Sequence, residues 1–180
     1  MNAEDAAGGD DEERLPGEPA TVDTLADVAG LANGVSSVTS VEVRCPSDAE
    51  PPERVSSILV AVGGGPHAAA TVDLARALAE ETDAWLELFH VATDDVDDEA
   101  LLDDATARLG EFERVDRWVV EEGAPASAIV EQSAYYDAVV LGSSTRGRVE
   151  RFVRGSTTAT VAERAASPVV VVSGDGATPI

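Results

Sequence analysis

The chain of 180 residues contains no lysine, a single cysteine and two histidines, and these shortages exclude several classes of function. Without lysine there is no Walker-type phosphate-binding lysine, no Schiff-base lysine and no lysine general base. The lone Cys45 excludes a disulfide framework, and one cysteine with two histidines gives no plausible metal cluster. We therefore expect neither a bound metal nor lysine-dependent catalysis.

Long apolar runs are also missing. No stretch of about eighteen apolar residues occurs, and the amino terminus is acidic instead of basic and then apolar. The sequence thus predicts no direct membrane insertion and no recognisable secretion signal, and we expect a cytoplasmic protein.

Positive charge is scarce, because 12 arginines face 35 acidic residues and the net charge is −23. Such an excess keeps a protein soluble but destabilises its compact state by self-repulsion unless salt screens it. A high acid content without lysine favours a cytosol of molar salt. The same charge argues against nonspecific nucleic-acid binding, which relies on basic residues that neutralise phosphates.

The first 54 residues differ in composition from the rest and include 13 acidic residues against 3 arginines. Residues 1–20 are expected to form a disordered acidic tail. Residues 21–54 form an extension, in which residues 22–33 have a helical apolar face with Thr21 as its cap. Residues 35–44 alternate weakly, as in a strand, and residues 46–52 are typical of a linker.

Residues 55–173 alternate between apolar strand patterns and helical patterns. The expected strands are near-continuous apolar runs, which indicates burial on both faces and hence a parallel sheet. The expected fold is α/β, an open doubly wound five-stranded parallel sheet sandwiched by helices. Residues 174–180 are expected to be a flexible tail. The strands are predicted at residues 58–62, 85–91, 117–120, 138–141 and 169–172, and the helices after Pro66, after Asp97, over 125–136 and over 156–165.

Two glycine-rich turns follow strands of this expected sheet. Gly63–Gly65 follows the first strand, while Gly142 follows the fourth and precedes Gly155 and Ser156 at a helix start. Ligands of open parallel sheets bind at the carboxyl ends of strands, and a free helix start suits phosphate. Ordinary strand-to-helix turn chemistry is the alternative interpretation, and the sequence leaves both open.

Four of the twelve arginines fall within nine residues, between the two glycines of the second turn. This island is a candidate site for an anion, a nucleotide phosphate or an acidic partner. The alternative is that these arginines pair with the abundant carboxylates of the same domain. The island consists of Arg146, Arg148, Arg151 and Arg154.

The two histidines and the hydroxyl residues near the turns are the candidates for catalytic or ligand chemistry. His67 follows the triple glycine and is expected to be a solvated loop residue, with contact to a bound phosphate as the alternative. His90 ends the second strand and is expected to be structural. Ser143 and Ser144 lie at a strand end, but their surroundings do not match the spacing of a nucleophile elbow, so a serine hydrolase is disfavoured.

The block from about Val55 to Ser173 resembles the universal stress protein family. The resemblance depends on the opening run Ile58–Val62, on the Gly142…Gly155-Ser156 motif and on the ending Ala162–Val172. It implies a five-stranded parallel α/β domain, without catalysis beyond slow ATP hydrolysis. It also implies a homodimer in which Val169–Val172, as an edge strand, pairs with its copy.

The resemblance also implies a nucleotide site. The ATP-binding branch has an aspartate where this chain has Gly63, and a middle glycine where it has Thr145, so we expect ATP or another adenine nucleotide to bind weakly at most. The phosphate-binding end of the motif is kept. The candidate nucleotide-site residues are Val62, Gly63, Gly64, Gly142, Thr145, Gly155, Ser156, Thr157 and Thr158.

Three functions remain open. The first is a non-catalytic regulatory protein of universal-stress type with an altered nucleotide or anion site. The second is a true ATP- or AMP-binding member that acts as a nucleotide-gated switch. The third is an interaction module that regulates a membrane transporter, suggested by the family likeness of the run Gly64-Gly65-Pro66-His67.

Overall fold

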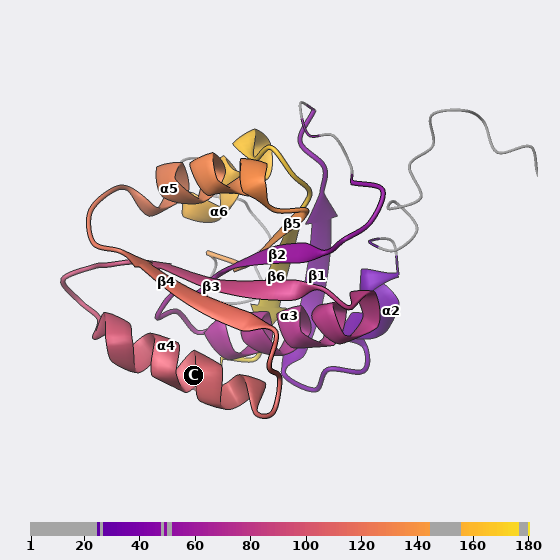
Figure 1. Cartoon of the computed structure of the whole chain (residues 1–180), viewed down its shortest axis with the longest axis horizontal. Helices are drawn as coiled ribbons and strands as arrows, with labels where there is room; N and C mark the ends of the chain where they lie inside the picture. The colour runs from indigo at the N-terminus through magenta and orange to yellow at the C-terminus, as the bar shows by residue number, and fades with distance from the viewer. Residues whose placement is uncertain (1–24, 26, 48, 50–51, 145–155, 177–179) are drawn as a thin grey trace, which may run out of the picture.

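The computed structural model describes residues 25, 27–47, 49, 52–144, 156–176 and 180. From Ser57 onward it alternates strands with helices, as the sequence predicts (Figure 1). A short helix and a strand precede this block. The elements are α2 (Val28–Ala32), β1 (Val38–Arg44), β2 (Ser57–Ala61), α3 (Ala68–Thr82), β3 (Trp85–Val91), α4 (Asp98–Leu109), β4 (Val115–Val120), α5 (Pro125–Gln132), the 3-10 turn η1 (Ser133–Tyr135), β5 (Ala138–Gly142), α6 (Thr157–Arg164) and β6 (Val169–Gly174).

These strands form one sheet in the order β1-β6-β5-β2-β3-β4. The strands β2 to β6 are parallel to their neighbours, whereas β1 runs antiparallel to β6. The helices α3 and α4 lie on one face and α5 and α6 on the other (Figure 1). The parallel, helix-covered α/β fold is thus confirmed, with six strands in place of the expected five.

The core occupies both faces of the sheet. Ile58, Leu59 and Val60 are consecutive in β2 and all have no exposed surface. Neighbouring strand residues point to opposite faces, so this burial requires helices on both sides. The strand sequences are continuously apolar because helices cover both faces of the sheet.

Local capping places the starts of two helices. The side chain of Asp97 accepts a hydrogen bond from the Ala100 N–H at 3.1 Å, and α4 begins at the next residue. In the same way the Ser156 hydroxyl accepts from the Ala159 N–H at 3.1 Å before α6. Such side-chain caps satisfy N–H groups that have no partner within the helix, which makes them readable from sequence.

The expected edge position of Val169–Val172 is wrong. The strand β1 pairs along all of it, from Val41 opposite Val172 to Arg44 opposite Val169. The extension therefore supplies the strand that covers this edge, and Val169–Val172 lies inside the sheet. A homodimer through Val169–Val172 remains a prediction, but it requires β1 to leave.

The ends of the chain depart from expectation in other ways. The predicted helix over 22–33 is described at Leu25, which is helical, and from Asp27 through α2, and the predicted acidic tail of residues 1–20 lies outside the described residues. The predicted tail at 174–180 begins too early, because Gly174 belongs to β6 and Ile180 packs against the core. Within the described part of the chain, no helix is long and apolar enough to span a bilayer.

Candidate functional site

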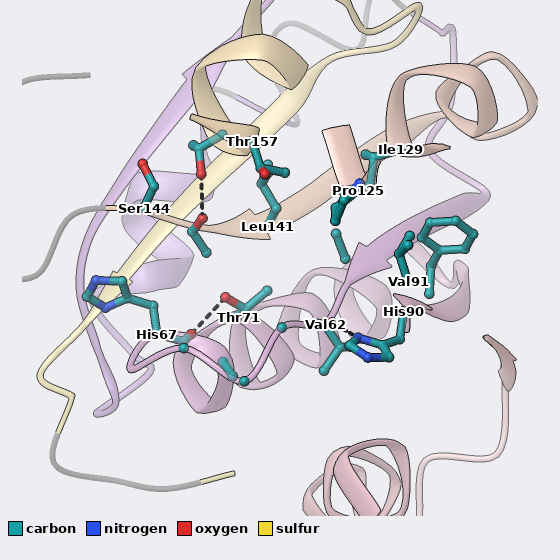
Figure 2. Close-up of a pocket in the computed structure, with 18 of the residues that line it drawn as sticks. Val62, His67, Thr71, His90, Val91, Pro125, Ile129, Leu141, Ser144 and Thr157 are labelled. Atoms are coloured by element: carbon teal, nitrogen blue, oxygen red, sulfur yellow. Dashed lines mark hydrogen bonds between the residues drawn. The ribbon is translucent and has the colours of Figure 1, made fainter. Parts of the chain in front are cut away.

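A cleft of about 280 Å³ lies at the carboxyl ends of β2, β3 and β5. The chain passes from β2 to β3 on one side and reaches β5 on the other, so this is where the strand order reverses. Open parallel sheets bind ligands at such points. In Figure 2, Ser144 and Thr157 lie on one side of the cleft and Val62 and His90 on the other. Most of its lining comes from the segments Ala61–Gly65, Phe89–Val91 and Leu141–Ser144, with Thr157 and Thr158 from the start of α6.

The loop after β2 approaches the cleft with little side chain. A Cβ at Gly63 or Gly65 would meet no atom within 4 Å, whereas one at Gly64 would lie 3.1 Å from Val96 Cγ2. Only the middle glycine of the three is thus packed against a neighbouring segment. A side chain at position 63 could therefore begin without meeting a neighbouring atom.

Gly142 has a different environment at the end of β5. A Cβ there would lie 3.2 Å from both His67 Cβ and Thr71 Oγ1. That separation is tighter than ordinary contact, so a glycine lets β5 pass close to the start of α3. The backbone of β5 consequently reaches the cleft without a side chain in between.

The start of α6 joins the same corner. The Thr158 hydroxyl donates to the Gly142 carbonyl at 3.0 Å, which fixes the helix start against the end of β5. Ser156 is engaged as the cap and does not line the cleft, whereas Thr157 and Thr158 do. The first N–H groups of a helix have no partner within it, and they carry the positive end of its dipole.

Six of the predicted site residues are thus brought together at the cleft: Val62, Gly63, Gly64, Gly142, Thr157 and Thr158. Two others, Thr145 and Gly155, lie outside the described residues. The same holds for the whole arginine island at positions 146, 148, 151 and 154.

His67 is buried, with 7% of its surface exposed, so the expectation of a solvated loop histidine is wrong. Its Nδ1 accepts a hydrogen bond from the Gly174 N–H at 3.0 Å. The end of β6 packs against the loop and excludes water from the ring. A contact between His67 and a bound phosphate stays a prediction.

His90 bridges two walls of the cleft. Its Nδ1 lies 2.8 Å from the Val62 carbonyl oxygen, and its Nε2 lies 2.7 Å from Asp98 Oδ1. A carbonyl oxygen and a carboxylate oxygen are both acceptors, so each ring nitrogen faces an acceptor. These contacts tie the end of β2 to the first turn of α4 and agree with the expected structural role of His90.

Sequence reasoning missed the apolar wall of the cleft, formed by Phe89, Val91, Pro125, Ile129 and Leu141. Val91 and Leu141 end predicted strands, and this position could have identified them as part of the cleft wall. The described residues that line the cleft include no carboxylate and no arginine. The polar groups of this lining are hydroxyls, backbone groups and two histidines. No group of three metal-ligating side chains is found among the described residues.

Residues 55–173 match the model of the universal stress protein family. The chain belongs to this family.

Solved structures of universal stress proteins resemble this chain in fold. One, in complex with cAMP, is 24% identical with a TM-score of 0.59, over 68% of this chain and 99% of its own. A universal stress protein from Archaeoglobus fulgidus DSM 4304 is 26% identical with a TM-score of 0.56, over 67% of this chain and 45% of its own. Another from Archaeoglobus fulgidus, in complex with dAMP, is 22% identical with a TM-score of 0.52, over 66% of this chain and 98% of its own.

No curated protein matches the chain. The family of residues 55–173 rests on the family model, and the fold is shared with the solved structures.

Proposed function

We propose that this universal stress domain is a non-catalytic regulatory protein whose cleft binds an adenine nucleotide weakly. The observation that carries the proposal is the meeting of three segments at one corner. The loop Gly63–Gly65, the end of β5 at Gly142 and the first turn of α6 all line the same cleft. The end of β5 and the helix start offer backbone groups to a phosphate, and the loop Gly63–Gly65 is then left to the nucleoside, which the aspartate at this position contacts in the ATP-binding branch of the family.

The remaining walls suit the rest of a nucleotide. Phe89, Val91, Ile129 and Leu141 provide an apolar surface for a base, and the hydroxyls of Ser144 and Thr157 stand near the phosphate corner. Small-molecule sites commonly combine a mostly apolar lining with a few polar groups. That cAMP and dAMP are bound by proteins of this fold supports the same ligand class.

The absence of catalysis is proposed because both histidines already have structural partners. His90 is held between the Val62 carbonyl and Asp98, and Nδ1 of His67 takes the Gly174 N–H. A histidine that activates a serine or water needs a ring nitrogen directed at that nucleophile. The domain would then regulate without catalysis, and its signal would be whether an adenine nucleotide occupies the cleft.

Weak affinity is proposed because Gly63 has no carboxylate at the nucleoside end. One missing buried hydrogen bond to a charged group costs about 1–3 kcal/mol, or roughly a factor of ten to a hundred in Kd. Since a Cβ at Gly63 meets nothing within 4 Å, the substitution Gly63→Asp adds the carboxylate without a clash.

Calorimetry with AMP, cAMP and ATP in concentrated KCl tests the proposal. We expect weak binding of AMP or cAMP by the unmodified chain, about tenfold tighter binding by Gly63→Asp, and no nucleotide hydrolysis. Gly65→Asp is the matched control, because it adds the same charge to the same loop at an equally open position.

Three results would contradict the proposal. Tight ATP binding by the unmodified chain would instead favour the nucleotide-gated switch. If Gly63→Asp and Gly65→Asp change the nucleotide affinity equally, the change comes from the added charge and not from a specific contact at position 63. If neither Gly63→Asp nor Gly65→Asp binds any of the nucleotides, the cleft is not an adenine-nucleotide site.

We further propose that the domain works in a cytoplasm of high salt. The net charge of −23 without any lysine supports this setting, since concentrated salt screens carboxylate repulsion.

A further inference from the structure

One face of the sheet carries two exposed tryptophans near its β4 edge. Trp85 is 42% exposed and Trp118 is 41% exposed, which is unusual among the large apolar residues of the described chain. Phe89 contacts Trp118 edge to face, with ring centroids 5.3 Å apart. Because side chains alternate along a strand, Trp85, Glu87 and Phe89 share this face of β3, and Asp116 and Trp118 share it on β4.

Two carboxylates lie between these tryptophans. Glu87 of β3 is directly opposite Asp116 of β4 in the ladder. Like charges in this position destabilise a sheet. Burial raises the pKa of Glu87, and the charge of Asp116 raises it further. Burial, and then the charges of Glu87 and Asp116, raise the pKa of the Tyr136 phenol.

No cation of the described chain neutralises this pair. Arg117, between Asp116 and Trp118, points to the opposite face and binds Asp103 of α4 at 2.5 Å. Arg114 pairs with Asp83 at 3.4 Å. Among the described residues, Glu87 and Asp116 therefore keep a repulsion that a basic group from outside would relieve.

Among the described residues, no strand pairs with the outer side of β4. β4 is the last strand of the sheet, on the side away from β1 (Figure 1). An unpaired strand edge offers backbone N–H and C=O groups to an extended segment. A segment paired there would set alternate side chains on the same face as Asp116 and Trp118.

We propose that Trp85, Glu87, Asp116 and Trp118 form an aromatic–acidic face that binds an extended basic segment of another protein. The segment adds along β4 and places arginine or lysine at alternate positions. Its cations fill the space between the two carboxylates and lie against the tryptophan rings.

Charge and ring chemistry both select this partner. A cation beside Glu87 and Asp116 forms charge-assisted hydrogen bonds, and indole is the strongest aromatic partner for a cation. The net charge of −23 attracts basic partners over long range and repels acidic ones. Trp85, Glu87, Asp116 and Trp118 do not line the nucleotide cleft, and Phe89 is the residue that joins this face to the cleft wall.

Tryptophan fluorescence measures binding at this face directly, because Trp85 and Trp118 are the two tryptophans of the chain. The probe is a synthetic peptide that alternates arginine with threonine. Its control has glutamate in place of each arginine. At the lowest KCl at which circular dichroism shows a folded chain, we expect the basic peptide to change the tryptophan fluorescence saturably. The acidic peptide should have no effect.

The variant Glu87→Gln with Asp116→Asn removes the charges and keeps the side-chain shapes. We expect it to raise the peptide Kd at least about tenfold. The control variant, Glu121→Gln with Glu122→Gln, makes the same change in net charge at exposed positions just after β4. It should change Kd by less than roughly twofold, as exposed charges contribute little.

The thermal midpoint separates binding from a structural role. Removal of the like-charge pair should raise Tm by roughly 1–4 °C, which also shows that the variant folds. A fall in Tm would assign the carboxylates to stability and overturn the proposal. So would an equal loss of peptide affinity in both double variants, or the absence of any fluorescence change. A dimer of the unmodified chain that Trp118→Ser abolishes would assign the face to a second copy instead.

Discussion

Glycines around the cleft have two different physical roles. At Gly174, beside the cleft residue His67, packing requires glycine, since a Cβ there would lie 2.7 Å from Ala70 Cβ and 3.0 Å from the Ser37 carbonyl oxygen. At Gly142 a Cβ would be tight, at 3.2 Å from His67 Cβ and Thr71 Oγ1. At Gly63 nothing fills the space that a side chain would take. The first role belongs to the scaffold, whereas the second leaves room for a ligand.

Glu87 makes the stability of the fold depend on pH. Its pKa in the folded chain is raised above the ordinary value of 4.5, so the folded chain holds this proton more tightly than the unfolded chain. Protonation of Glu87 therefore contributes to the free energy of unfolding. This contribution is lost as the pH rises from about 4.5 through the raised pKa. Glu87→Gln should gain stability over the parent across this window and keep a constant advantage above it.

Denaturant unfolding at a series of pH values measures this difference. Glu122→Gln is the control, because Glu122 is an exposed glutamate just after β4. Its stability should follow the parent at every pH. A Glu87→Gln curve parallel to the parent through the window would contradict the expectation.

At the scale of elements, β1 decides the boundary of the sheet. The turn before it is anchored by Ser37, whose hydroxyl donates to Asp73 Oδ2 of α3 at 2.5 Å. Arg108 of α4 donates two bonds of 2.7 Å to the same carboxylate. The extension is therefore joined to the domain by both a strand ladder and a polar network across two helices.

Detachment of β1 should expose β6 to self-association. Val41 and Val43 face the core from β1, so Val41→Asp with Val43→Asp puts charges where apolar contact is needed. The freed edge of Val169–Val172 then becomes a template for a second copy. We expect light scattering to show a larger dimer fraction than in the intact chain.

Ser40→Asp is the matched control, since Ser40 is an exposed residue of the same strand. It should leave the mass unchanged. A chain shortened to begin at Pro52 lacks β1 altogether and gives a second test. If both the double variant and the shortened chain fold and remain monomeric, self-association through β6 is refuted.

At the scale of the whole molecule, carboxylates outnumber their partners. In the described residues, arginine side chains pair with Glu42, Glu80, Asp73, Asp83 and Asp103. The chain has 35 acidic residues and only 12 arginines, so most carboxylates cannot be paired. Repulsion between them acts over the screening length, about 3 Å in 1 M salt and about 10 Å in 0.1 M salt.

The thermal midpoint should therefore fall as KCl is lowered from molar to tens of millimolar. Melts followed by circular dichroism measure it, and NaCl at equal ionic strength should give the same curve if screening is the cause. A midpoint that does not change with salt would remove the argument for a high-salt setting.

The sequence by itself determined the features that depend on neighbouring residues. Apolar runs bounded by turns placed the strands, Asp97 and Ser156 placed helix starts, and the glycine turns marked strand ends where the cleft lies. These follow from rules that operate over a few residues, such as alternation, capping and turn chemistry.

Only the tertiary structure decided which distant segments meet. The pairing of β1 with β6, the burial of His67 against Gly174 and the opposition of Glu87 and Asp116 all join residues far apart in the chain. A short alternating run such as β1 is compatible with several partners and registers, so local pattern cannot choose among them. The choice is made by the summed burial and hydrogen bonding of the whole sheet, a quantity that exists only once the strands are assembled.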